Sequence, residues 1–240
     1  MRSKMEVEHA LIARYLDIVR LEDLGVLAAE QEDLAGLFVS SVSNEYLDSN
    51  RRVMIVGKET RSWIGGLRKA ENFQDVETYI RHAMQRHAVY VQNPQTKSKF
   101  FQFYKETSRK MAGKTPALPG AVIWANLFCL SYKTQSPIRA IGQFERIKNL
   151  SRELLRAQIE ILKPDVIFFV TGASYDKYIK EFFKISEGRA VVKKSLWSFK
   201  ADGIPCYRTT HPQWEKGRAD RNQALALALS TVEFPDNEKS

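Results

Sequence analysis

Hydrophobic positions along the chain follow two spacings that alternate with each other. Short apolar runs at 53–56 and 122–125, and the stretch 165–170, which is apolar after Asp165, are typical of parallel strands buried on both faces. At 147–162 the apolar residues instead recur at helical spacing, and Lys163-Pro164 ends the predicted helix before the next strand. Helices that alternate with buried strands predict an α/β fold.

The other segments continue this alternation. The spacing predicts a helical layer within 6–48 and further helices at 74–88, 99–111, 175–185 and 220–232. Two strand-like stretches, 190–200 and 204–209, flank the turn sequence Ala201-Asp202-Gly203 and predict a hairpin.

We therefore predict a three-layer α/β/α sandwich around a central, mainly parallel four-stranded sheet. The chain has 240 residues, of which 44% are hydrophobic, and this is enough for one sizeable core. We expect a single domain over 1–240, with a helical N-terminal layer at 1–50 and a polar tail at 235–240. We also expect a monomer.

Composition narrows the classes of function. No stretch approaches the roughly 20 consecutive apolar residues of a membrane span, and the first residues lack a signal core, so we expect a cytoplasmic protein without a membrane partner. Cys129 and Cys206 fall in predicted strands as buried thiols, and two cysteines cannot supply a four-cysteine iron-sulfur cluster. His9, His82 and His87 lack metal-ligand spacing, so we expect neither a metal nor another cofactor.

The chain is strongly basic, with a formal net charge of +9 at pH 7 and a pI near 9.5. A polyanion is the natural partner of such a protein, because each phosphate that it neutralises releases counterions. Basic and aromatic residues are mixed at 97–105 and 193–200, which suits contact with phosphates and stacking on bases. The alternative for these segments is a half-buried surface with solvated lysines. The charge favours nucleic acid as the partner.

Polar residues follow three of the predicted strands. Glu59 lies in the turn after 53–56, Asn126 follows 122–125, and His211 follows 204–209. Because open α/β sheets bind ligands at the carboxyl ends of their strands, these three side chains would converge. A carboxylate, an amide and an imidazole together are suited to breaking a bond to a nucleobase.

The chemistry of that bond explains the three residue types. Cleaving an N-glycosidic bond develops positive charge on the sugar and negative charge on the departing base. Glu59 would stabilise the sugar cation and orient the attacking water, and His211 would donate a hydrogen bond to the developing oxyanion. The amide of Asn126 offers a donor and an acceptor, which suits reading the edge of an extruded pyrimidine.

Short motifs in this order resemble the uracil-DNA glycosylase superfamily. Gly57-Lys58-Glu59-Thr60 resembles its first motif, Asn126 within Trp124-Ala125-Asn126-Leu127 its base-reading position, and Thr210-His211-Pro212-Gln213 its last motif. The stretch 162–172 resembles its penultimate core strand. The resemblance covers residues 51–230 and implies a DNA glycosylase that flips out a base, hydrolyses its N-glycosidic bond and leaves an abasic site.

The resemblance also implies contacts around the base and the DNA. Trp63 and Phe73 would stack on the flipped base, and Gln213-Trp214 lies where the superfamily inserts a loop into the duplex. The other expected contacts are to the base from Gly57, Lys58, Thr60 and Arg61, and to DNA from Thr210, Pro212, Gln213, Trp214 and Gly172.

Departures from the superfamily's commonest motifs bear on the substrate. Glu59 stands where many uracil-removing members have Asp, Thr60 where Pro is common, and Gln213 where a small residue often follows His-Pro. Arg61 occupies the place where the uracil-specific branch uses Tyr to exclude groups on carbon five. This altered gate predicts a pyrimidine enlarged at carbon five, such as a hypermodified cytosine in phage DNA, since the superfamily includes prokaryotic antiphage glycosylases. Uracil removal in base-excision repair is the alternative.

Each candidate residue also has a purely structural explanation. Glu59 would complement a helix dipole, Asn126 would cap a turn, and His211 would begin an exposed loop. The candidate aromatic residues would fill the core. At the level of function, a catalytically inactive DNA-binding module predicts no effect of a Glu59→Ala substitution. An enzyme acting on small nucleosides predicts weak, salt-insensitive affinity for DNA.

Overall fold

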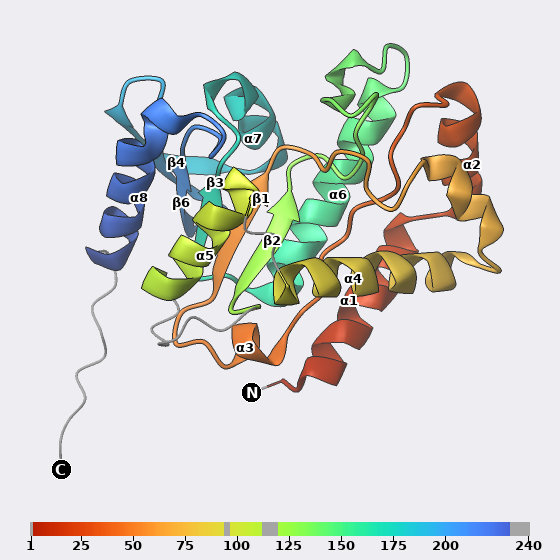
Figure 1. The fold of residues 1–240 in the computed structure, drawn as a ribbon, viewed down its shortest axis with the longest axis horizontal. Coiled ribbons are helices and arrows are strands. Elements are labelled where there is room, and N and C mark those ends of the chain that lie inside the picture. The colour runs from red at the N-terminus through yellow and green to blue at the C-terminus, as the bar shows by residue number, and fades with distance from the viewer. Residues whose placement is uncertain (1, 94–96, 112–119, 231–240) are drawn as a thin grey trace.

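The computed structural model describes residues 2–93, 97–111 and 120–230, and one six-stranded sheet lies at its centre (Figure 1). The strand order is β2-β1-β3-β6-β5-β4. The first four strands in this order run parallel, whereas β5 is antiparallel to β6 and β4 to β5. The strands are β1 (Val53–Gly57), β2 (Val122–Asn126), β3 (Val166–Phe169), β4 (Ile185–Val192), β5 (Leu196–Ala201) and β6 (Ile204–Arg208).

The predicted α/β class with a mainly parallel sheet is confirmed, but the described residues form six strands, two more than expected. The predicted stretch 190–200 contains a turn after Val192, so it splits between β4 and β5. The predicted helix at 175–185 ends at Phe182, because Ile185 already pairs with Ala201 across β4 and β5. The expected hairpin around Ala201-Asp202-Gly203 is present between β5 and β6.

Helices cover both faces of this sheet. They are α1 (Lys4–Ile18), α2 (Leu21–Glu30), α3 (Asn44–Leu47), α4 (Val76–Gln92), α5 (Lys99–Met111), α6 (Phe144–Leu162), α7 (Asp176–Phe182) and α8 (Arg218–Ser230). Short 3-10 turns lie at η1 (Leu67–Asn72), η2 (Pro137–Arg139), η3 (Ala173–Tyr175) and η4 (Glu215–Gly217). The helices predicted at 74–88, 99–111 and 147–162 are confirmed as α4, α5 and α6.

Two hydrophobic clusters show why the central strands are apolar throughout. Side chains alternate between the two faces of a strand, so Met54 and Val56 join one cluster and Val53 and Ile55 the other. The first cluster contains buried residues of α1, α4, α6 and α7, and the second contains those of α5 and α8. Every residue of β1 is buried because both faces are covered by helices.

Part of the predicted helical layer at the N-terminus is wrong. Leu34, Leu37 and Phe38 lie in an extended segment between α2 and α3, although all three are buried. Backbone groups in this segment bond to other parts of the chain: the amide of Phe38 donates to the carbonyl of Cys129 at 2.8 Å. Helical spacing failed here because tertiary partners satisfy the backbone.

Cys129 also departs from its expected place. It follows β2 in a segment without strand structure, whereas Cys206 lies in β6, and both thiols are buried and unpaired. The expected tail at 235–240 and the last residues of the helix predicted at 220–232 lie outside the described residues. Within the described ranges, no helix combines the length and the apolar character that a membrane span requires.

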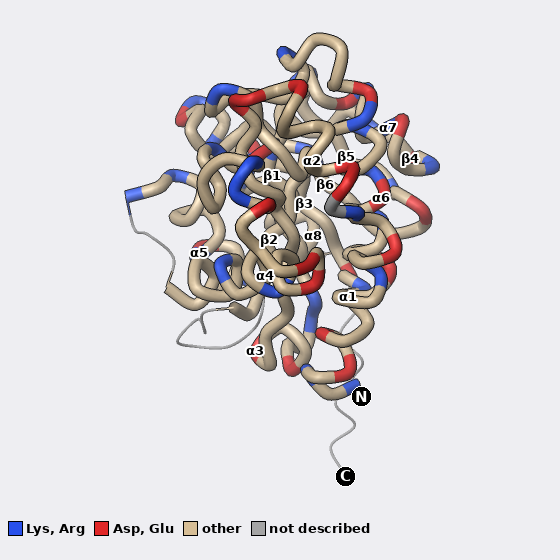
Figure 2. The backbone as a smooth tube through the Cα atoms, turned by 90° about the vertical axis from the view of Figure 1, so that its right-hand side faces the viewer, with Lys and Arg blue, Asp and Glu red and all other residues tan. Residues whose placement is uncertain are grey.

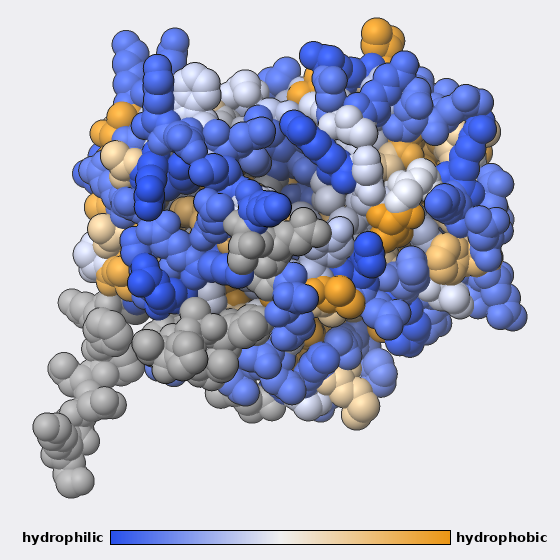
Figure 3. Space-filling view, in the orientation of Figure 1, coloured by the Kyte–Doolittle hydropathy of each residue, from blue (hydrophilic) through white to orange (hydrophobic). Residues whose placement is uncertain are grey.

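The surface is polar on the faces shown. Lys and Arg are interspersed with Asp and Glu along the backbone in Figure 2, and the face in Figure 3 is mostly hydrophilic, with hydrophobic residues in small separate patches. The net positive charge therefore does not form one continuous basic face in Figure 2. A local concentration of cations lies instead around a cavity at one end of the sheet.

Candidate active site

A cavity of about 730 Å³ lies beyond the carboxyl ends of β1 and β2. Glu59, Asn126 and His211 all line it, so the three strand-end residues come together as their places in the sequence predict. β1 and β2 are neighbours, with Gly57 opposite Asn126, and His211 follows β6 two strands from β1. Gly57, Lys58, Thr60, Arg61, Trp63 and Gln213 from the predicted set also line the cavity.

The backbone of Gly57 lies so close to the Asn126 side chain that there is no space for a Cβ atom at position 57. A Cβ built on Gly57 would lie 2.5 Å from Oδ1 of Asn126, a distance that real Cβ atoms do not show. Pairing continues beyond the strands, because the amides of Leu127 and Phe128 donate to the carbonyls of Gly57 and Lys58 at 2.9 and 2.8 Å. The turn that carries Glu59 is therefore held directly beside Asn126.

Two hydrogen bonds orient the buried amide of Asn126. Its Oδ1 accepts from Nε1 of Trp124 at 3.1 Å, and its Nδ2 donates to the hydroxyl of Thr60. Since the indole N–H is only a donor, the oxygen must face Trp124, and this determines the orientation of the amide. One N–H and one lone pair of Asn126 have no partner in these bonds, which gives the cavity a donor beside an acceptor.

His211 presents a neutral imidazole. Its Nδ1 accepts the backbone N–H of Gln213 at 3.2 Å, so in the neutral ring the proton is on Nε2. Burial, followed by the charges of Lys58, Arg61 and Arg221, lowers the pKa of His211 to about 4. At pH 7 the ring is therefore an uncharged donor through Nε2.

Buried arginines hold the loop that carries His211. Arg208, at the end of β6, forms a bidentate pair with Asp176, with N–O distances of 2.7 and 2.9 Å. Arg221 of α8 donates to the Thr210 hydroxyl at 3.1 Å and to the Trp214 carbonyl at 3.0 Å. Planar guanidinium groups with several donors suit this bracing, and they fix both ends of the loop.

Glu59 lies half-buried in the turn after β1. Burial raises the pKa of Glu59 above its usual value, while Lys58, Arg61 and a hydrogen bond from Tyr175 oppose the increase. The Tyr175 hydroxyl lies 3.5 Å from Oε2 of Glu59, and burial with the nearby Glu59 charge raises the pKa of Tyr175 to about 12. Tyr175 therefore keeps its proton at neutral pH and acts as a donor to the carboxylate.

Sequence reasoning missed Tyr175. It comes three residues after Gly172, in the turn that follows β3, and β3 lies between β1 and β6. The expectation that strand ends converge contained the signal for this residue, because the strand at 165–170 ends in the same region of the sheet. Lys58 extends across the Tyr175 ring, with Nζ 5.0 Å from the ring centroid.

Aromatic rings form one wall of the cavity. The wall consists of Trp63, Tyr90, Phe100, Phe101 and Trp124. Phe100 is half-buried, and its ring is stacked near His211, with centroids 6.5 Å apart and an interplanar angle of 24°. Phe100 lies in the basic and aromatic stretch 97–105 but was not singled out by its sequence. Its ring beside the imidazole is open to a planar ligand in the cavity, whereas Trp63 is almost fully buried.

The other predicted residues do not line the cavity. Phe73 does not line it and packs instead against Tyr79 and His82, with centroid distances of 5.2 and 5.1 Å. Thr210, Pro212, Trp214 and Gly172 are also absent from its lining. The indole of Trp214 is 60% exposed on the loop beside the cavity, and Gly172 has a φ of 79° in the turn after β3.

No protein-family model matches the chain, and no curated protein matches it. Among the residues that the structure describes, no group of three or more His, Cys, Asp or Glu side chains is arranged to hold a metal ion. The geometry of the cavity therefore carries the functional argument.

Proposed function

We propose that the protein is a DNA glycosylase, a divergent member of the uracil-DNA glycosylase superfamily, that extrudes and excises a modified pyrimidine. One observation carries this proposal: a carboxylate, an oriented amide and a neutral imidazole, from the ends of three strands, line one cavity. The motif order described above and the net charge of +9 support a DNA substrate. The enzyme would act as a cytoplasmic monomer.

The reaction would begin with an extruded base against Asn126. The remaining N–H and lone pair of this amide would bind the polar edge of a pyrimidine, and Phe100 would stack on its ring. Extrusion is necessary because the glycosidic carbon is inaccessible in a stacked duplex. Trp214, exposed beside the cavity, would occupy the space that the base leaves in the duplex.

Bond cleavage would place opposite charges at the two ends of the site. The electron pair of the C1′–N bond leaves with the base, and Nε2–H of His211 donates to the base oxygen where negative charge develops. The carboxylate of Glu59 stabilises the positive sugar and accepts a proton as water adds to C1′. Protonation of the departing base then leaves a free base and an abasic site.

The form of the cavity supports an enlarged base. Its volume of about 730 Å³ falls in the range that drug-sized ligands occupy, and this is more space than one unmodified pyrimidine requires. Arg61 is exposed at the edge of this cavity and of a neighbouring one of about 310 Å³. A long, flexible side chain here leaves room at carbon five, which supports hypermodified cytosine in phage DNA as the substrate and antiphage defence as the role.

The deciding experiment measures abasic sites. The protein is incubated with DNA that carries uracil, normal bases or hypermodified cytosines, and alkali-labile breaks are counted. Release of a hypermodified base would support the proposal, whereas release of uracil alone would identify a repair enzyme. In a Glu59→Gln variant we expect release to fall about 10³-fold, because the isosteric amide cannot accept the proton. Glu22→Gln, an exposed change in α2, is the matched control.

A DNA-binding module without catalysis is the competing outcome. It would bind every DNA tested, release no base, and bind equally well after the Glu59→Gln change. Binding without release would therefore refute the glycosylase assignment.

A further inference from the structure

One rim of the cavity carries cations that the proposed cleavage does not use. We call it the α4 rim. Its cations are Lys69 in η1, Arg86 in α4 and Lys97 before α5, and it also includes His82 of α4. The only carboxylate among the residues that line the cavity is Glu59. His82, Arg86 and Tyr90 are spaced four residues apart, so they lie along one face of α4.

The rim is separated from the reaction centre by aromatic rings. The ring centroids of Tyr90 and Trp63 are 5.2 Å apart, and those of Trp63 and Trp124 are 5.6 Å apart. The indole N–H of Trp124 donates to Asn126. Eight residues of an α-helix span about 12 Å, so His82 lies well beyond Tyr90 along the helix. His82 and Arg86 therefore lie farther towards the N-terminal end of α4 than Tyr90, whose ring packs against Trp63.

The described residues provide no carboxylate partner for the lysines and the arginine of the rim. Within the part of the chain that the structure describes, Lys69, Arg86 and Lys97 form no ion pair with a carboxylate. Other cations nearby are paired: Arg81 of the same helix lies 2.5 Å from Glu77, and Lys99 lies 2.8 Å from Glu215. Like charges around a concave surface raise the local concentration of anions.

Arg86 is also oriented. Its guanidinium lies over the Tyr90 ring, 5.3 Å from the centroid, and this contact reduces the number of positions that the planar group can adopt. A guanidinium offers a rigid pair of N–H donors that matches two oxygens of a phosphate. Lys69 and Lys97 add flexible point charges at the same cavity.

We infer that the α4 rim binds a phosphate or similarly compact anionic group. Two sources share this chemistry: a phosphodiester next to the extruded nucleotide, or an acidic group carried on the enlarged base. Assigning the anion to a DNA substrate rests on the proposed function, whereas anion binding by the rim does not. The two inferences can therefore fail separately.

The first experiment tests anion binding without DNA. Inorganic pyrophosphate is titrated into the full chain by calorimetry, and the same titration is made with Arg86→Gln, Lys69→Gln and Arg81→Gln. We expect the two rim variants to weaken binding about tenfold, because each removes a charge-assisted hydrogen bond, and Arg81→Gln to bind like the unmodified protein. Absence of pyrophosphate binding, or an equal loss in all three variants, would overturn the inference.

The second experiment identifies the source of the anion by DNA affinity at several salt concentrations, which requires no base release. If Arg86 contacts the DNA backbone, Arg86→Gln reduces the slope of the logarithm of affinity against the logarithm of salt concentration by about one, the value for one phosphate contact. This reduction should be the same for every DNA and absent in Arg81→Gln. If the anion belongs to the base, the loss is confined to DNA whose pyrimidine carries a carboxylate on carbon five, compared with a hydroxymethyl group. Unchanged affinity for both DNAs would remove the rim from the DNA-binding site.

Discussion

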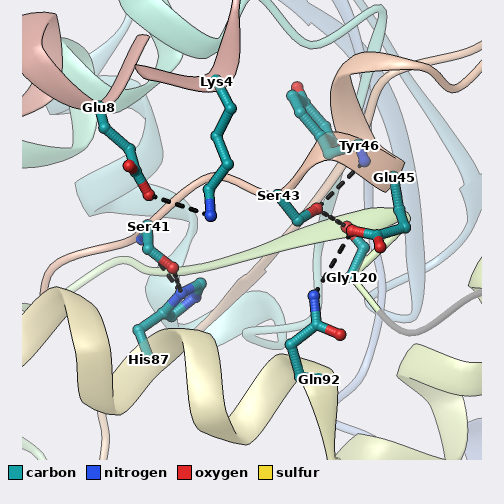
Figure 4. Close-up of polar contacts among 9 residues, drawn as sticks. All are labelled: Lys4, Glu8, Ser41, Ser43, Glu45, Tyr46, His87, Gln92 and Gly120. Atoms are coloured by element: carbon teal, nitrogen blue, oxygen red, sulfur yellow. Dashed lines mark hydrogen bonds and ion pairs between the residues drawn. The ribbon is translucent and has the colours of Figure 1, made fainter. Parts of the chain in front are cut away.

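His87 and His211 share a low pKa but differ in what surrounds them. Burial lowers the pKa of His87 to about 4, and the same main cause lowers the pKa of His211 to about 4. His87 is fully buried, and Figure 4 shows it beside Ser41, whose amide lies 3.0 Å from Nδ1. Its Nε2 is bonded to the Trp124 carbonyl at 2.8 Å. His211 lines the cavity, and among the described residues its ring is hydrogen-bonded through Nδ1 and has no partner at Nε2.

The difference shows that a shifted pKa does not by itself identify a functional residue. The imidazole rings of His87 and His211 are both neutral at pH 7. In His87, however, both ring nitrogens are hydrogen-bonded, and these bonds connect the 40–43 segment to β2. The free Nε2–H of His211 can still donate to a ligand. Unused hydrogen-bonding capacity beside a cavity is therefore the more informative sign of a site.

The largest expected effect is on base release. In His211→Ala, the rate should fall by about 10² to 10³-fold, because the proposed donor to the departing base is lost. Thermal unfolding should change little, since the ring makes one hydrogen bond at the edge of a cavity. Single-turnover release and calorimetry measure the two quantities. If His211→Ala unfolds at a lower temperature but releases the base at the original rate, the ring has a structural role and not a catalytic one.

For His87→Ala we expect the opposite result. The change removes a buried ring, leaves the Ser41 amide without this acceptor and takes one of two side-chain partners from the Trp124 carbonyl, which still accepts from the Ser40 hydroxyl. The free energy of unfolding should therefore fall by about 2 to 4 kcal/mol. Urea denaturation measures this loss. His82→Ala, an exposed change one turn earlier on α4, is the control and should lie within about 0.5 kcal/mol of the unmodified protein.

Acid sharpens the comparison further. The folded pKa of His87 lies below that of an unfolded histidine, so the unfolded chain binds more protons as pH falls from about 6.5 towards 4. Stability contributed by the neutral ring is present above pH 6.5, and roughly 1 to 2 kcal/mol should be lost by pH 5. Denaturation at several pH values should show a shallower slope in His87→Gln. Equal slopes would contradict the assignment to His87.

The smallest expected effect concerns Arg61. Arg61→Tyr places a rigid ring at the mouth of the cavity and should reduce release of a bulky base by about tenfold, while release of uracil, if any, should not fall. Competition between the two substrates in one reaction measures the ratio. If the bulky base is released at the original rate, Arg61 is not part of the gate.

Periodicity alone was sufficient for the class of fold and for most elements. The apolar run of β1 and the helical spacing of α6 were readable because each pattern repeats within a few residues and reports burial directly. The same order of strands placed Glu59, Asn126 and His211 at one end of a parallel sheet. Their convergence followed from the direction of the strands, because helices that alternate with buried strands indicate a parallel sheet whose carboxyl ends share one edge.

Only packing of distant segments decided the rest. Leu34, Leu37 and Phe38 have helical spacing but are extended, because their segment bonds to residues far along the chain. Phe73 and Phe100 are both phenylalanines outside the predicted strands, yet Phe73 packs on Tyr79 and Phe100 stacks near His211. The protonation state of His211 likewise depends on burial and on charges from other elements. Such effects arise from contacts between residues remote in sequence, and local patterns do not record them.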